Sequence, residues 1–193
     1  MNLHSAESGS NMTLLQIHPG GYVWHVPRAG REAHLLRLVS QTGRLVLITN
    51  SSREAIDYSE RLTLSGVPVL VATDTSNVAV VDAFNDDHVS TLIATQEYVI
   101  ANGPIEARMV VHLRTSSSVR DYERRIDAAL APVHVTFIVP EDERRMVSLL
   151  SHLKADSGHG EPADVEFEDI VDLTSADDFA MVGHARRRIR LRG

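Results

Sequence analysis

Cysteine is missing from this sequence of 193 residues. Disulfide bonds, cysteine-ligated zinc and thiol nucleophiles are therefore excluded. Lysine is nearly missing as well, because Lys154 is the only lysine among the 19 lysines and arginines. A phosphate-binding P-loop ends in Gly-Lys-Ser/Thr, since the lysine ammonium reaches the terminal phosphates of the nucleotide. Lys154 follows His152 and Leu153 with no glycine loop before it, so these residues contain no P-loop.

Long hydrophobic runs are also lacking. No apolar stretch approaches the roughly 20 residues that cross a bilayer, and the polar start, Met1 to Asn11, has no signal-peptide core. We therefore expect a cytoplasmic protein with no membrane partner. The formal net charge of −7 gives no general attraction to nucleic acid, so such binding would need a local basic patch.

Signatures of metal sites and of serine hydrolases are absent from the sequence. The ten histidines include no His-x-x-x-His pair, and no cysteine accompanies them as a second type of ligand. No Gly-x-Ser-x-Gly elbow is present to position a serine nucleophile. We therefore expect neither a metal site nor a bound cofactor.

Short continuous apolar runs, which are typical of strands buried on both faces, recur along most of the chain. Amphipathic segments or crossovers of helical length separate them, and this alternation predicts an α/β fold with a doubly wound, mainly parallel sheet. Two further extended segments, 14–17 and 22–26, flank a His-Pro-Gly-Gly turn. The predicted buried strands span residues 44–50, 67–73, 89–95, 108–114 and 133–139, and the predicted helices span 33–39, 51–62, 77–85, 118–130 and 140–153.

Hydroxyl and amide side chains follow four of the five predicted buried strands, as in the run from Thr49 to Ser52. In doubly wound sheets, ligands bind beyond the carboxyl ends of the strands. Such a rim can hold phosphate oxygens through backbone N–H groups. The same residue types also cap helices, so the pattern alone leaves both interpretations open.

The order of these segments from about Leu14 to Leu153 resembles the C-terminal, second RecA-like domain of DEAD-box and related superfamily 2 helicases. Residues 47–51, Leu-Ile-Thr-Asn-Ser, are similar to the family's fourth motif, and residues 82–95 to the run into its fifth motif. Residues 121–126, Asp-Tyr-Glu-Arg-Arg-Ile, resemble the start of its sixth motif. The resemblance implies a RecA-like fold and a surface that contacts nucleic acid.

The departures from the family pattern fall on its catalytic groups. After Thr95 the family continues Asp-x-Ala-x-Arg-Gly-x-Asp, whereas this chain has Gln-Glu-Tyr-Val-Ile-Ala-Asn-Gly. Arg125 matches the first arginine of the sixth motif, but Ala128 stands at the arginine-finger position and Ala131 at the last arginine. Loss of an arginine finger costs about three to five orders of magnitude in the rate of phosphoryl transfer. The resemblance therefore implies a pseudoenzyme that keeps the helicase fold.

The composition changes near Ala155 and predicts three regions: a disordered start at residues 1–13, a helicase C-terminal-like domain at 14–155, and a tail at 156–193. The tail is an acidic segment followed by an arginine-rich end. That end can bind RNA or DNA phosphates, fold back on the acidic segment, or serve only solubility. Its arginines are Arg186, Arg187, Arg188, Arg190 and Arg192.

Together these features predict a non-catalytic, helicase-like module that binds nucleic acid, RNA in particular, or a helicase or other protein partner. Asn50, Ser51, Arg53, Thr95 and the tail arginines are the expected nucleic-acid contacts, and Arg125 is expected to face a vestigial nucleotide cleft. A second copy of the chain is a further candidate partner. Two alternatives remain: half of a split ATP-dependent helicase that needs a P-loop partner chain, and a small-molecule enzyme on a RecA-like sheet.

Overall fold

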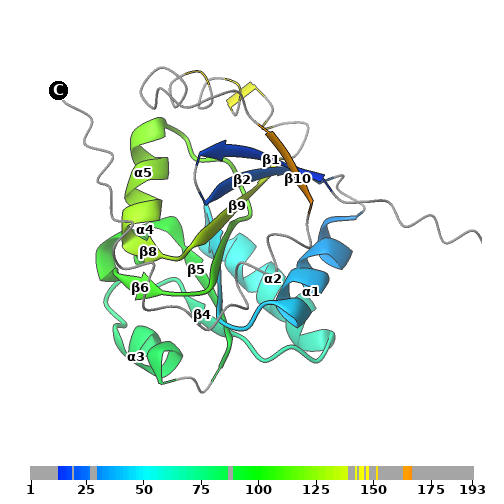
Figure 1. Ribbon diagram of the computed structural model, residues 1–193. Helices are drawn as coiled ribbons and strands as arrows, with labels where there is room; N and C mark the ends of the chain where they lie inside the picture. Colours follow the sequence, from blue (N-terminus) through cyan, green and yellow to red (C-terminus); the bar gives the residue numbers. More distant parts are fainter. Residues whose placement is uncertain are drawn as a thin grey trace, which may run out of the picture.

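The computed structural model describes residues 13–18, 20–26, 30–86, 89–138 and 163–166, together with the single positions 142, 144, 145, 147 and 151. Within these residues one large sheet carries helices on both faces (Figure 1). No helix among them is long and apolar enough to cross a bilayer.

The main sheet has eight strands in the order β10-β1-β2-β9-β7-β3-β5-β4. Six neighbouring strands, from β2 to β4 in this order, run parallel. At one edge, β1 pairs antiparallel with both β2 and β10. The strands are β1 (Thr13–His18), β2 (Gly21–His25), β3 (Leu45–Thr49), β4 (Leu70–Ala72), β5 (Thr91–Thr95), β7 (Met109–His112), β9 (Val133–Ile138) and β10 (Ala163–Glu166), while β6 (Ile105–Glu106) and β8 (Ala129–Leu130) form a separate small sheet.

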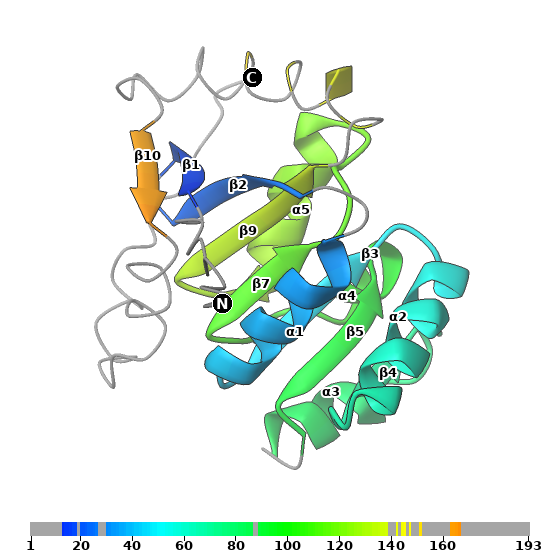
Figure 2. The same cartoon turned by 90° about the vertical axis from the view of Figure 1, so that its right-hand side faces the viewer.

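The central strands are buried on both faces, because helices cover each side of the sheet. Every residue of β3, β5, β7 and β9 is buried, which explains why their sequences are continuous apolar runs rather than alternating ones. Helices α1 (Arg31–Gln41) and α2 (Ser52–Leu64) cover one face (Figure 2). Helices α3 (Ala79–Asn85), α4 (Gln96–Asn102) and α5 (Val119–Ala128) cover the other.

Hydroxyl caps start three of the five helices in the described part of the chain. Ser51 Oγ accepts from the N–H of Glu54 at 3.3 Å, and Ser118 Oγ accepts from the N–H of Asp121 at 3.1 Å. Thr95 Oγ1 caps α4 in the same way, from the last position of β5. These contacts satisfy backbone donors that a helix N-terminus otherwise leaves unpaired.

The predicted α/β fold with a doubly wound, mainly parallel sheet is confirmed. All five predicted buried strands are present, and the segments at 14–17 and 22–26 form the hairpin β1-β2. Gly20 permits the turn between them, because its φ is +76° and a Cβ there would lie 2.4 Å from the backbone oxygen of Pro132. Most of the helix predicted at 140–153 lies outside the described residues.

Four elements were not predicted. The stretch after β5, expected as an irregular crossover, contains α4, and the small sheet of β6 and β8 follows from the same crossover and the end of α5. Strand β10 lies beyond the domain boundary expected at residue 155 and pairs with β1 in the main sheet. The sheet therefore includes a part of the chain that was assigned to the tail.

Candidate functional site

The carboxyl ends of the parallel strands meet at one edge of the sheet, where doubly wound folds bind their ligands. Asn50 follows β3, Thr95 ends β5, and Arg114 follows β7. Since β3 lies between β5 and β7 in the sheet, these three positions are close in space although they are far apart in sequence. Helix α5 adds Arg125 to the same edge.

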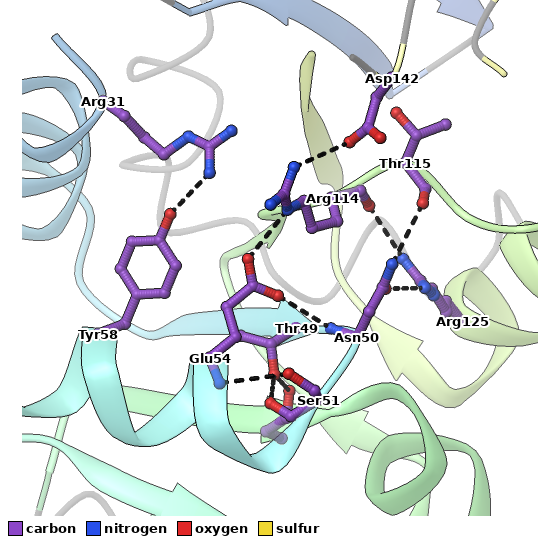
Figure 3. A network of polar contacts seen from close by, with 11 residues as sticks. Arg31, Thr49, Asn50, Ser51, Glu54, Tyr58, Arg114, Thr115, Arg125 and Asp142 are labelled. Atoms are coloured by element: carbon purple, nitrogen blue, oxygen red, sulfur yellow. Dashed lines mark hydrogen bonds and ion pairs between the residues drawn. The ribbon is translucent and has the colours of Figure 1, made fainter. Parts of the chain in front are cut away.

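Arg125 is the centre of a polar network at this edge (Figure 3). Its Nη2 donates to Asn50 Oδ1 at 2.6 Å and also to Gln96 Oε1, to which Nε donates at 2.8 Å. Its Nη1 donates to the backbone oxygen of Arg114 at 3.2 Å. One guanidinium thereby joins α5 to the ends of β3 and β7 and to the start of α4.

The Arg125 side chain lies inside the protein, with 1% of its surface exposed. Burial lowers the pKa of Arg125 to about 10, although the carboxylates of Asp121, Glu97 and Glu54 oppose this shift. The hydrogen-bond acceptors around the guanidinium are amide and backbone oxygens rather than carboxylates. The structure therefore places Arg125 within the fold and not on the wall of an open cleft.

A second arginine on this edge holds α2 in place. Arg114 Nε donates to Glu54 Oε1 at 3.0 Å, and its Nη1 lies 3.5 Å from Asp142 Oδ2. Burial opposes the charged form, but the hydrogen bond and the charges of Glu54 and Asp142 outweigh it and raise the pKa of Arg114. Glu54 Oε2 also accepts from the backbone N–H of Asn50 at 3.4 Å.

The structure brings together three of the predicted nucleic-acid contacts. Asn50, Ser51 and Arg53 are all exposed around the start of α2. Asn50 is held on both sides, because its Nδ2 donates to the backbone oxygen of Thr115 at 3.5 Å while its Oδ1 accepts from Arg125. Ser51 uses its hydroxyl as the α2 cap. Arg53 projects from the first turn of the helix.

The other predicted contacts stand differently. Thr95 is 3% exposed and its hydroxyl caps α4, so only neighbouring backbone could present this position to a ligand. The tail arginines, Arg186, Arg187, Arg188, Arg190 and Arg192, lie outside the described residues. Among the residues that are described, no three His, Asp or Glu side chains lie close enough together to share a metal ion.

Sequence reasoning missed Gln96, Glu54 and Arg114 as members of this edge. Gln96 stands directly after Thr95, where the helicase pattern has an aspartate, and this position was a usable signal for a partner of Arg125. Glu54 lies three residues after the Ser51 cap, in the spacing of a capping box. Arg114 gave no such signal, because only the fold brings it to Glu54.

Comparison with solved structures finds the same architecture in helicases. The C-terminal domain of S. cerevisiae Dbp5 bound to Gle1 and IP6 is 19% identical with a TM-score of 0.55, covering 72% of this chain and 84% of that one. A DEAD box protein from Methanococcus jannaschii is 15% identical with a TM-score of 0.61, covering 71% of this chain and 40% of that one. The RNA-helicase Prp28 from Chaetomium thermophilum, bound to ADP, is 17% identical with a TM-score of 0.61, covering 72% and 37%.

The chain has the fold of a helicase C-terminal domain. No family model matches its sequence, and no curated protein proves similar to it. At these levels of identity the likeness establishes the RecA-like fold alone. Arg125, which resembles the first arginine of the sixth motif in sequence, donates a hydrogen bond to Gln96 within this fold.

Proposed function

We propose that this chain is a non-catalytic helicase-like module that binds nucleic acid, RNA in particular, or a helicase or other protein partner. The observation that carries the proposal is the burial of Arg125 in a network with Asn50 and Gln96. Its guanidinium is engaged within the fold, while alanines stand at the other two arginine positions of the sixth motif, Ala128 and Ala131. Among the described residues, none of the three positions that resemble the sixth-motif arginines therefore offers a free guanidinium to a transferring phosphoryl group.

The proposed nucleic-acid contacts are on the surface at the start of α2. Asn50, Ser51 and Arg53 supply an amide, a hydroxyl and a guanidinium, which are groups that bind phosphate and sugar oxygens. The tail arginines supply the dense positive charge that the acidic chain otherwise lacks. Two solved structures with this fold support the choice of partners: one contains S. cerevisiae Dbp5 bound to RNA and ADP BeF3, and another contains Dbp5 bound to Gle1 and IP6.

Fluorescence anisotropy with single-stranded RNA tests the proposal. The full chain is compared with a variant in which the five tail arginines are changed to glutamine, which leaves β10 in place. Each phosphate neutralised contributes a slope of about 0.7 to the dependence of log K on log salt, so we expect the slope to fall by up to about 3.5. Arg53→Gln should weaken binding further, whereas Arg124→Gln, an exposed arginine on α5, is the matched control. Equal affinity of the wild type and the tail variant at every salt concentration would contradict the role of the tail.

A second candidate is half of a split ATP-dependent helicase. The observation in its favour is that the chain spans 40% of the Methanococcus jannaschii DEAD box protein and 37% of Prp28. Only this candidate predicts that ATP hydrolysis appears when the chain is mixed with a separate P-loop domain. A pull-down from native lysate with and without nuclease then separates partners bound through nucleic acid from those bound directly.

A further inference from the structure

A pocket of about 380 Å³ lies between the start of α1 and α2, on the face of the sheet opposite α5. Its walls carry charges of both signs together with a tyrosine. They are formed by Arg31, Glu32, Glu54, Asp57, Tyr58, Arg61 and Arg114. Neither the helicase resemblance nor the proposed nucleic-acid contacts assign a role to this pocket.

Arg31 is the unusual residue of the pocket. Its Nη1 donates to the hydroxyl of Tyr58 at 3.0 Å. Its Nε and Nη2 are shielded from water and have no hydrogen-bond partner in the described part of the chain. These two nitrogens form one edge of the guanidinium, and this edge is the donor pair that a carboxylate or phosphate accepts in a bidentate contact. A buried donor without a partner costs free energy, and an oxyanion bound at this edge would offset that cost. We call the Nε and Nη2 edge of Arg31 the fork.

Two of the three acids that line the pocket are held by other arginines and do not fill that fork. Glu54 accepts from Arg114 at 3.0 Å, and Glu32 lies 3.7 Å from Arg61. Figure 3 shows the Arg114–Glu54 pair on one side of the pocket and Arg31 above Tyr58 on the other. Arg31 is therefore the arginine of the pocket that has no carboxylate partner among the described residues.

We infer that this pocket binds a small molecule through a carboxylate, which accepts from Nε and Nη2 of Arg31. A single negative charge fits better than a phosphate dianion, because Glu32, Glu54 and Asp57 also line the pocket. The Tyr58 hydroxyl accepts from Arg31 and keeps its own proton, which it can donate to the ligand. Because Nε and Nη2 are covered in the protein without a ligand, binding requires the Arg31 side chain, which has four rotatable bonds, to turn this edge toward the pocket that it lines.

Asp57 narrows the class of ligand. It lines the pocket and is exposed, and it has no ion pair or hydrogen bond within the residues that the structure describes. An unmatched cation and an unmatched anion in one pocket are complementary to a zwitterion. The preferred ligand is thus a carboxylate that carries an ammonium group close by, as an α-amino acid does.

Guanidinium NMR of the full chain provides the test. The Nε–H resonances of the arginines are followed during titration with sodium acetate, glycine, a capped glutamate peptide and sodium phosphate, with sodium chloride as the control for ionic strength. We expect acetate and glycine to move the Arg31 resonance in a saturable way, with glycine binding more tightly than acetate. Arg31→Lys keeps the charge but lacks the fork, and we expect it to weaken binding about tenfold or more. Arg124→Lys, at an exposed position of α5 outside the pocket, should bind as the wild type does.

The variants and probes make each outcome decisive. Asp57→Asn should abolish the preference for glycine over acetate while leaving acetate binding intact. The wild-type titration follows the Nε–H resonance of Arg31 itself, so it tests ligand binding even if the Arg31→Lys variant folds poorly. The inference is overturned if neither acetate nor glycine moves the Arg31 resonance, if phosphate binds and the carboxylates do not, or if only the capped peptide binds. None of these results depends on whether the chain binds RNA.

Discussion

Arg125 is a buried, charged side chain whose hydrogen bonds connect helix α5 to the carboxyl edge of the sheet. Its guanidinium donates to Asn50, Gln96 and the backbone of Arg114, which come from three separate elements at the carboxyl edge. Because Arg125 is buried, removing its guanidinium withdraws four hydrogen bonds from inside the fold. Arg125, which resembles the first arginine of the sixth helicase motif, therefore contributes to the stability of the folded state in this chain.

Replacing Arg125 with methionine tests this role at the scale of one residue. The substitution keeps much of the volume but removes the hydrogen bonds to Gln96, Asn50 and the backbone of Arg114, and we expect the free energy of unfolding to fall by about 2 kcal/mol. Arg124→Met is the control, because Arg124 directly precedes Arg125 on α5 and is exposed. It should change the free energy of unfolding by no more than about 0.5 kcal/mol. Urea denaturation followed by circular dichroism measures both. Equal free energies of unfolding for the two variants would contradict a stabilising role of the Arg125 hydrogen bonds.

At the scale of the element, the start of α5 is fixed by reciprocal hydrogen bonds. Asp121 accepts from the hydroxyls of Ser117 at 2.6 Å and Ser118 at 2.9 Å, and its own N–H donates to Ser118. The two hydroxyls lower the pKa of Asp121. The carboxylate also stands at the positive end of the helix dipole. This arrangement orients the helix that carries Arg125.

The lowered pKa of Asp121 makes a prediction for acid stability. A carboxyl group whose pKa is lower in the folded state binds fewer protons there than in the unfolded chain, so its stabilising effect is present above the unfolded pKa and is lost as pH falls through the folded one. We expect Asp121→Asn to lower stability at neutral pH and to converge with the wild type in acid. Urea midpoints measured from neutral pH down to about pH 3 check this. A constant difference across that range would mean that the carboxylate charge plays no part.

The sequence could predict those elements whose pattern of apolar and polar residues follows from which of their faces are buried. The runs at β3 and β5 are apolar throughout because both faces are covered, and this requirement is visible in the residues themselves. Strand β10 escaped prediction because its four residues join the sheet edge through backbone pairing with β1, which no side-chain pattern announces. Helix α4 was missed because the stretch after Thr95 was expected to be an irregular crossover, although Thr95 is a good N-cap.

The candidate site was predictable in its members but not in its contacts. Asn50 and Arg125 were both singled out, yet they were given separate roles, as a nucleic-acid contact and as a cleft residue. Their hydrogen bond at 2.6 Å depends on the strand order and on the packing of α5, which a sequence does not state. Local signals such as caps are read directly, whereas a contact between residues 75 positions apart needs the fold.

At the scale of the whole molecule, the sheet and its helices have the fold of a helicase C-terminal domain, and the arginine that resembles the first one of the sixth motif is buried within it. Each face of the sheet has its own cluster of buried hydrophobic residues. We propose that the surface at the start of α2 and the arginine tail bind the partner, and that the chain keeps the helicase-like scaffold without its catalysis.

Calorimetric titration of the purified chain with ATP and Mg²⁺ tests that claim most directly. Because Arg125 is engaged inside the fold and the sequence has no P-loop, we predict no saturable heat of binding and no release of phosphate. Saturable ATP binding that disappears in the Arg125→Lys variant, while Arg124→Lys retains it, would contradict the account.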